Sequence, residues 1–479
     1  MFLAMLLSLS LTFSLVCLED ARVHGMKTRL EAAGESAMDS LFAAYDGDVF
    51  GDYGLLVFSG EGLPEERSPE EDVWIHLQKE LNPKTESFFF HGNLYREAVR
   101  EVYVTDEWAV TERGGELFIR DALDYMKYRA VGIGLEELLE QVRLLEEGEE
   151  ALEENENERK EQEGKRFGGE DPGEESGPGS GSGSDGTDYS EATAGSWLEK
   201  AQELMENGWL DLIIPIERVS SRYETDKKGF PSEKYLSRSR FFEPLPFYDP
   251  ASRLLFSEYL LESFTCFTTV EDQKGMQYQL EYLLGGKKSD RKNLESAVKK
   301  LLLLREGLDY ASLMASEQKR GQTELLASAI AGWTGIAPLI WLVQTAVAAS
   351  WAFCEAIVDV RTLLGGGKVP LIKDDAEWVI RPDNIAVLLD GDTKLAGKGD
   401  RGTDYRGCLR LLLYLSDMQT LAYRAMDVIQ EDIGAKRPGF SLDNCIYAMS
   451  VSVRAEAKPL FIRPGRDRYS FVETFSRMY

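Results

Sequence analysis

The segment LTFSLVCLEDARVHGMKTRLEAAGESAMDSLFAAYD, residues 11–46, changes character along its length without a turn signal. It starts inside an apolar run in which no side chain from Met1 to Leu18 is charged. Beyond that run, apolar residues recur mostly at three- and four-residue steps: Val23, Met26, Leu30, Ala33, Ala37, Met38, Leu41 and Phe42. No proline interrupts them. The pattern predicts one continuous helix that is apolar at first and amphipathic afterwards.

The apolar run is almost long enough to cross a membrane. As a helix it spans roughly 27 Å, against a hydrocarbon core of about 30 Å. Residues 1–18 are therefore predicted to be a transmembrane anchor. A cleaved signal peptide and a lipoprotein processed at Cys17 stay open as alternatives. No Lys or Arg precedes the run and no A-x-A site follows it, which argues against a cleaved signal and suggests that the true start lies upstream.

Charge limits the classes of partner. The net charge is −29, and nucleic acid is not expected to bind, because phosphate binding needs a basic face. Much of the excess is local: 17 acidic and four basic residues lie between Glu146 and Glu191. This stretch continues into SGPGSGSGSDG and has little apolar content. Residues 148–195 are predicted to be a disordered acidic Gly/Ser linker.

The parts on either side of this linker predict an α+β head. Residues 19–147 hold the stalk helix and a first α+β part. Strand-like stretches are expected at Tyr53–Phe58 and Arg100–Glu112, and helices at Glu116–Arg129 and around 135–145. Residues 196–479 form a helix-rich C-terminal part with terminal strands. Its expected helices are Ser196–Asn207, Ser252–Phe264, Tyr278–Leu284 and Asn293–Met314. A loop with a possible strand and two more helices are expected within Asp374–Ile433.

The end of the chain alternates as a half-buried strand does, over Asn444–Ile462. One face of this strand carries Ile446, Ala448, Ser450, Ser452 and Arg454, and the other carries Tyr447, Met449, Val451, Val453 and Ala455. We expect this strand to pair with strands of the first part, across the linker.

Leu325–Cys354 is a second stretch without a charge, 30 residues long. Its length alone would allow a second transmembrane helix, which would put the C-terminal part in the cytoplasm. Gln344 lies inside it, and Glu355, Asp359 and Arg361 continue the helical phase directly. We favour two buried helices with a break near Gly335–Pro338. Within Asn293–Met314, LLLLREGLDYASLM is apolar nearly all round and predicts a central core helix.

No catalytic, cofactor-binding or metal-ligating residue is predicted. The five cysteines are widely spaced and the three histidines have no metal-ligand spacing. Ser316-Glu317-Gln318-Lys319 matches S-x-x-K, but the S-D-N and K-T-G partners of penicillin-binding enzymes are missing. Gly367-Lys368 lacks the P-loop pattern and is interpreted as a helix stop.

Three weaker patterns could mark ligand sites, but each has a structural explanation that is preferred. The carboxylates in Asp390–Asp404 fail the EF-hand order at Lys394, so a solvated turn is preferred to a calcium loop. Glu258 and Glu262 lie four residues apart and indicate an exposed acidic helix face rather than a glycosidase pair. The aromatic stretch Ser239–Pro250 would suit a sugar or peptide, but packing under a proline-rich loop is preferred.

Several stretches resemble a bacterial family described as domain of unknown function 5702. They include the 18–46 helix, YGLLVF, LLFSEYLLESFTCF, LEYLLGGKKSDRKNLESAVKKLLLLREGLDY, WAFCEAIVDVRTLLGGGKVPLIK, YRGCLRLLLYL and RAMDVIQEDI. The resemblance implies a Gram-positive protein that accompanies tight-adherence (Tad, Flp-type) pilus components, with an N-terminus similar to TadE/TadG-type pseudopilins. It brings no activity and no catalytic residues. The prepilin-peptidase pattern is absent, since Glu19 lies at the end of the apolar run.

The sequence therefore predicts a single-pass cell-membrane protein with an extracellular head. It is expected to be non-enzymatic and to act by protein–protein contact, as an accessory or pseudopilin-like component of a pilus or related secretion machinery. The alternative is a cell-wall-active hydrolase or sugar-binding surface protein. The sequence names no cofactor, small-molecule ligand or oligomeric state.

Overall fold

A computed structural model of the chain describes residues 2–60, 63, 67–81, 95, 97–130, 213, 219, 229–236, 249–270, 275–332, 336–381, 399, 401–461 and 468–479. The predicted linker, the helices expected at Ser196–Asn207 and around 135–145, most of the aromatic stretch 239–250 and most of the loop 390–404 lie outside these residues.

The chain divides into two compact units. Unit 1 comprises residues 1–125, 229–246 and 425–479, and unit 2 comprises residues 126–228 and 247–424. The division falls inside two helices, α4 (Glu116–Ala130) and α16 (Met418–Lys436). Each unit is therefore assembled from segments that are far apart in the sequence.

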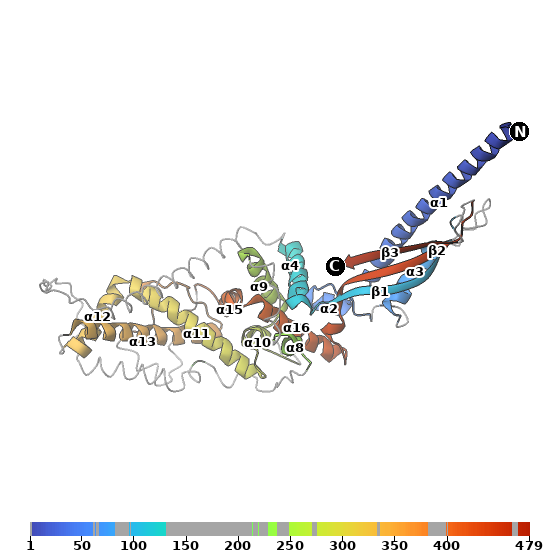
Figure 1. The fold of residues 1–479 in the computed structure, drawn as a ribbon. Helices are drawn as coiled ribbons and strands as arrows, with labels where there is room; N and C mark the ends of the chain where they lie inside the picture. Colours follow the sequence, from blue (N-terminus) through green and yellow to red (C-terminus); the bar gives the residue numbers. More distant parts are fainter. Residues whose placement is uncertain are drawn as a thin grey trace. The chain divides into compact units, whose positions relative to one another are not determined.

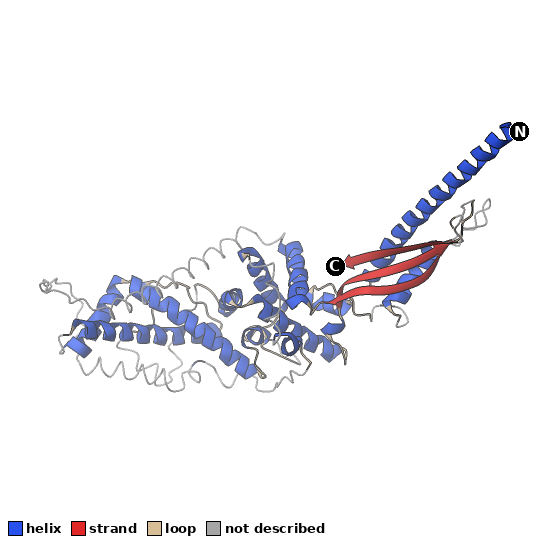
Figure 2. Ribbon diagram, viewed as in Figure 1, coloured by secondary structure: helices blue, strands red, loops and turns tan. Residues whose placement is uncertain are grey.

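Unit 1 is built on a three-stranded antiparallel sheet in the order β1-β2-β3 (Figure 2). The strands are β1 (Glu97–Ala109), β2 (Ile446–Ala457) and β3 (Tyr469–Met478). The central strand β2 pairs with β1 from the first part of the chain, as the sequence predicted. Its Tyr447, Met449, Val451, Val453 and Ala455 are buried, which confirms the predicted inner face.

Helices cover one face of this sheet (Figure 1). α1 (Phe2–Phe42) is a single uninterrupted helix, and from Met26 onward it packs on the sheet beside α3 (Pro69–Leu81). Their shared core contains Met26, Leu30, Ala37, Leu41, Val73, Leu77, Leu81, Val99, Met449, Val451, Val453, Phe471 and Phe475. The continuous helix expected from the sequence is thus confirmed. Unit 1 also contains α2 (Gly47–Tyr53), α8 (Pro231–Tyr235) and the short helices Arg113–Gly115 and Leu442–Asn444.

Unit 2 is helical in its described part. Its helices are α9 (Pro250–Ser263), α10 (Gln279–Gly285), α11 (Asp290–Ala315), α12 (Glu317–Ala331), α13 (Ala337–Leu364), the short helix Asp375–Glu377 and α15 (Tyr405–Leu415). α9, α11 and α15 each follow a residue whose side chain accepts a hydrogen bond from a first-turn amide: Asp249, Ser289 and Asp404. α9, α10 and α11 agree with the sequence predictions to within a few residues, whereas α12 begins eight residues before the expected Leu325.

Two of the described helices are long and apolar enough to cross a membrane by length and composition. In α1 the apolar window is only 6% buried, whereas in the second, Pro338–Leu364, the window is 56% buried. The break before α13 falls between Ala331 and Ala337, where it was expected. α13 packs against α11 and α12, and from Val347 onward it is largely buried. This packing favours the buried-helix interpretation over a second span.

Two sequence predictions need correction. The stretch Tyr53–Phe58 is not a strand, because Tyr53 ends α2 and only Phe58 forms an isolated bridge, to Ile446. α11 is not apolar all round in its setting: Leu303 is 68% exposed, while Arg305 and Asp309 are buried. The run of leucines predicted an apolar helix, whereas the helix places two charged side chains in the interior.

Candidate functional site

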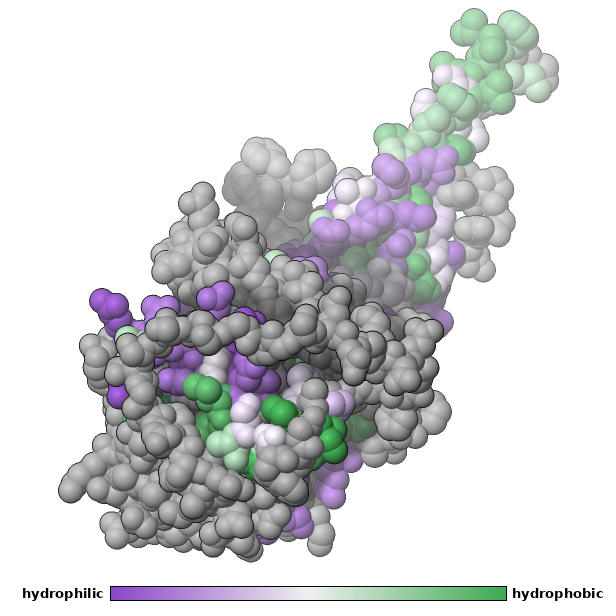
Figure 3. Space-filling view, turned by 90° about the vertical axis from the view of Figure 1, so that its left-hand side faces the viewer, coloured by the Kyte–Doolittle hydropathy of each residue, from purple (hydrophilic) through white to green (hydrophobic). Residues whose placement is uncertain are grey.

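The clearest candidate site lies where α1 stops being exposed and enters unit 1. Large apolar side chains from Phe2 to Leu18 are exposed, many of them by more than half (Figure 3). One residue later, Glu19 is fully buried, and Arg22 is 3% exposed. Their side chains form an ion pair with Nη2 of Arg22 2.7 Å from Oε1 of Glu19. We call this pair the latch.

The latch ties α1 to two loops at the end of the sheet. The backbone amides of Leu460 and Phe461 donate to Oε2 of Glu19 at 3.3 and 2.8 Å. Arg22 donates to the carbonyl oxygens of Tyr95 and Lys458 at 2.5 and 2.7 Å. Each charge therefore has backbone partners as well as its opposite charge, the arrangement that offsets the cost of burying ions.

Electrostatics favour the ionised form of Glu19. Burial by itself raises a carboxyl pKa, but hydrogen bonds from Arg22 and from the Phe461 and Leu460 amides outweigh it. They hold the pKa of Glu19 below its usual value. Glu19 is therefore ionised at neutral pH.

A second set of polar contacts holds α1 two turns further on. Arg29 pairs with Glu97 of β1 at 2.9 Å and donates to the carbonyl of Leu81 at the end of α3. Ser36 donates to Glu80, and Ser40 hydrogen bonds to His76 at 2.9 Å. The exposed part of α1 is thus continuous with a helix that is fixed along its remaining length. No break in the helix separates the apolar segment of α1 from the part that packs in unit 1.

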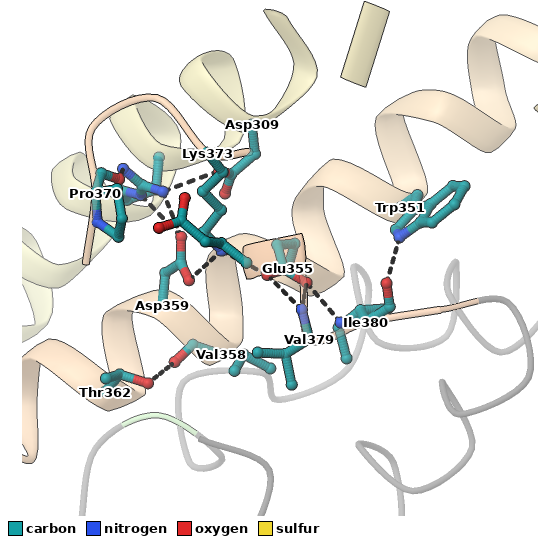
Figure 4. A network of polar contacts seen from close by, with 12 residues as sticks. Asp309, Trp351, Glu355, Val358, Asp359, Thr362, Pro370, Lys373, Val379 and Ile380 are labelled. Carbon is teal, nitrogen blue, oxygen red and sulfur yellow. Dashed lines mark hydrogen bonds and ion pairs between the residues drawn. The ribbon is translucent and has the colours of Figure 1, made fainter. Parts of the chain in front are cut away.

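Unit 2 contains a different cluster of charges, enclosed between α11, α13 and residues 370–380 (Figure 4). Arg305 lies between Asp309 and Asp359, and its Nε donates to Asp359 at 3.0 Å. Lys373 donates to both Glu355 and Asp359 at 2.5 Å. The side chains of all five are at most 2% exposed.

This cluster pins the segment 370–380 to the helices. Arg305 donates to the carbonyl of Pro370 at 2.8 Å, and Glu355 accepts from the Ile380 amide at 2.7 Å. At the C-terminal end of this segment, the indole N–H of Trp351 donates a hydrogen bond to the carbonyl of Ile380. Burial raises the pKa of Asp309 well above its usual value, against the influence of Arg305. Each of the five side chains pairs with an opposite charge inside the cluster, and Oδ2 of Asp309 is buried without a hydrogen-bond partner.

The residues singled out from the sequence are mostly engaged in structure. Ser316 caps α12 and donates to Asp375 at 3.1 Å, and Asp375 also pairs with Lys319. Ser316 and Lys319 are thus both held by the carboxylate of Asp375. Gly366, with φ +86°, follows the end of α13, so the glycine run is a helix stop as predicted.

The remaining candidates are also accounted for where the structure describes them. Glu258 pairs with Arg410, and Glu262 pairs with Arg129. They do not face each other across a cleft. None of the five cysteines, all of which the structure describes, forms a disulfide. Among the described residues, no three His, Cys, Asp or Glu side chains are placed to share a metal ion.

Sequence reasoning missed Glu19 and Arg22. A signal was present, because they continue the buried stripe of α1 backward from Met26 at steps of four and three residues. Because both residues are charged and directly follow the apolar run, the sequence suggested that they were exposed to solvent. Their partners lie more than 70 and more than 430 residues away, in segments that the local pattern does not connect.

The fold and this site define an α+β protein whose apolar N-terminal helix is carried on an antiparallel sheet. Residues 187–457 match the family of unknown function DUF5702, and since this is more than half of the chain, the protein belongs to that family. The matched range contains β2 and the described helices of unit 2, while α1 and β1 precede it. No curated protein and no solved structure is significantly similar to the chain.

Proposed function

We propose that this protein is held in the cell membrane by an uncleaved N-terminal helix and displays a non-enzymatic head outside the cell. Its role would be that of a pseudopilin-like or accessory component of a Tad-type pilus or related secretion machinery, acting through protein–protein contacts. The observation that carries the proposal is the latch: the exposed apolar half of α1 passes without a hinge into a half that is fixed in unit 1.

The latch also supports retention of the helix. In the folded chain residues 19–22 belong to the same uninterrupted helix as the apolar half, and the side chains of Glu19 and Arg22 are buried. Cleavage after Leu18 would also remove the apolar half and leave a new charged N-terminus directly beside Glu19. An anchor that stays on the chain fits this geometry better than either processed form.

The first experiment follows processing, with epitope tags at both ends of the chain expressed in its host. We expect one membrane-bound product that carries both tags. A shorter product that has lost the N-terminal tag would establish a cleaved signal. Lipid labelling that disappears in Cys17→Ser would establish a lipoprotein. Leu9→Lys, which places a charge in the apolar run, should release part of the protein from membranes, whereas Leu9→Ala should not.

The second experiment tests location and role. In protoplasts, external protease should cut in residues 148–195 and should reach both a tag in the head and the C-terminal tag. Protection of the C-terminal tag alone would instead support a second span at Leu325–Cys354, and protection of everything would place the head in the cytoplasm. Sheared surface filaments are then compared between the parent and a deletion strain. Loss of filaments supports the pilus role, and unchanged filaments contradict it.

A further inference from the structure

One face of the unit 1 sheet packs on α1 and α3, and the opposite face carries two rows of side chains. Core-facing residues of the sheet include Val102, Val104, Met449 and Val451, so Tyr103 and Ser450, which lie between them, point to the opposite face. The register shift between Val104 and Asp106 puts Asp106 and Trp108, which pair with Ser450 and Ala448, on that same face. On that face Trp108 and Tyr103 of β1 are 38% and 41% exposed. They form an aromatic row that extends over about 17 Å of strand.

A row of hydroxyl groups runs beside the aromatic one. Ser450 and Ser476 form a hydrogen-bonded pair at 2.8 Å, and Ser452 forms another with Thr474 at 2.8 Å. The strand register puts Asp106 beside Ser450, and Tyr103 beside Ser452. Each aromatic residue therefore has a hydroxyl group next to it or one step along the strands.

A cationic side chain contacts Trp108, one of the two aromatic residues of this row. The Arg113 guanidinium carbon lies 4.0 Å from the centre of the Trp108 ring. Arg113 has φ +54°, and among the described residues it is the one non-glycine residue with positive φ. This is a conformation that side chains with a Cβ rarely adopt. The Arg113 guanidinium therefore lies against the indole ring of Trp108.

Beside Trp108 the face is hollowed. A groove of about 220 Å³ is lined by Asp106, Trp108, Ala448, Met449, Ser450, Ser476, Arg477 and Met478. Its wall therefore includes the indole ring of Trp108, the carboxylate of Asp106 and the hydroxyl groups of Ser450 and Ser476. Sites for small polar molecules commonly combine an aromatic wall with a few placed polar groups in this way.

We propose that this face binds a neutral glycan, with pyranose rings packed on Trp108 and Tyr103 and sugar hydroxyls bonded to Asp106 and the serine pair. A pyranose ring has an aliphatic C–H face and a polar edge, which match the two rows. The nearby arginines are already engaged: Arg113 with Trp108, Arg454 with Glu101 and Arg477 with Asp39. The remaining carboxylate, Asp106, repels anions, so a phosphorylated or acidic polymer is disfavoured.

This inference is independent of the pilus proposal, since it concerns a surface of unit 1 rather than the anchor. It also differs from the sugar-binding alternative considered from the sequence, which used the aromatic stretch 239–250. The surface would let a membrane-anchored head attach to a polysaccharide layer.

The test uses the full-length chain in a detergent without a sugar headgroup. Titration calorimetry measures binding of chitotetraose, cellotetraose and maltotetraose, each up to about 10 mM, a tenfold excess over a dissociation constant of about 1 mM. We expect at least one of them to bind. Trp108→Ala should weaken that binding by about tenfold or more, and Ser476→Ala by about two- to fivefold. Trp108→Phe should retain part of the affinity.

The matched control is Trp74→Ala, because Trp74 is 43% exposed on α3 and does not line the groove. It should leave affinity unchanged, and thermal melting establishes that each variant is folded. If Trp108→Ala does not fold, Ser476→Ala and Asp106→Asn decide the question. The proposal is overturned if none of the three sugars binds, or if the variants of this face bind as tightly as the parent. It is also overturned if Trp74→Ala weakens binding as much as they do.

Discussion

At the scale of single residues, the buried charges of this protein are held in groups whose members are not equivalent. In the unit 2 cluster, Asp359 accepts from both Arg305 and Lys373, whereas Asp309 contacts Arg305 through one oxygen. Burial raises the pKa of Asp309 and so favours its protonated form. An uncharged side chain of the same shape should therefore suit position 309 better than position 359.

This difference gives the first prediction. Asp359→Asn removes the charge shared by two buried cations and should lower the free energy of unfolding by about 3–5 kcal/mol. Asp309→Asn resembles the protonated acid and keeps an oxygen acceptor for Arg305, so its cost should stay below about 1.5 kcal/mol. Urea denaturation at pH 7, followed by circular dichroism, measures both. Equal losses for the two variants would contradict the assigned roles.

At the scale of elements, the position of α1 on the sheet depends on a close approach. Gly34 faces Phe475 of β3, and a Cβ built on Gly34 would lie 2.1 Å from the ring carbon Cζ. No side chain fits there unless the ring moves. Gly51 in α2 is the opposite case, since a Cβ added to it meets nothing within 4 Å.

The second prediction compares these two glycines. Gly34→Ala should overpack the interface and lower the free energy of unfolding of unit 1 by about 1–3 kcal/mol. Gly51→Ala, in a helix with free space, should raise it by about 0.5–1 kcal/mol. The measurement is chemical denaturation of the full chain. A neutral Gly34→Ala would mean that the helix and the sheet are further apart than described.

At the scale of the whole molecule, several carboxyl groups are buried in ways that couple stability to pH. Burial raises the pKa of Glu281 to about 7, even though the Phe267 amide and the Tyr405 hydroxyl donate to it. Burial likewise raises the pKa of Asp121 and of Glu431 to about 7 and that of Asp290 to about 6. In the unfolded chain these groups titrate near pH 4.

The third prediction follows from the sign of these shifts. Because the folded state holds these protons more tightly, the stability they contribute is present below about pH 4 and is lost as pH rises through about 6–7. The melting temperature should therefore fall between pH 5 and pH 8. Glu19 and Asp46, whose pKa values are lowered, act in the opposite direction and reduce stability below about pH 4.

Calorimetry across this range can isolate one group. Glu281→Gln keeps an acceptor but removes the titration, so the slope for the unit 2 transition should become shallower. Glu317→Gln changes an exposed glutamate of α12 and serves as the control, with the parental slope expected. A slope in Glu281→Gln as steep as in the parent would show that its proton does not contribute.

The elements that could be predicted from the amino-acid sequence are those whose signals are local. The unbroken α1, the break between α12 and α13, the stop at Gly366 and the two faces of β2 all follow from periodicity and from the backbone preferences of glycine and proline. β3 was missed apart from the general expectation of terminal strands, and Tyr53–Phe58 was taken for a strand, because short apolar runs do not fix their own conformation.

The sequence could not predict which charges are buried or which face of the sheet packs on α1 and α3. Glu19 and Arg22 look like ordinary flanking charges until Tyr95, Lys458 and Phe461 are brought to them from distant segments. The aromatic row likewise lies beside the hydroxyl row only because β2 pairs with β1 on one side and with β3 on the other, each in one register. Pairing and burial depend on contacts between distant parts of the chain, and a local pattern carries no information about those partners.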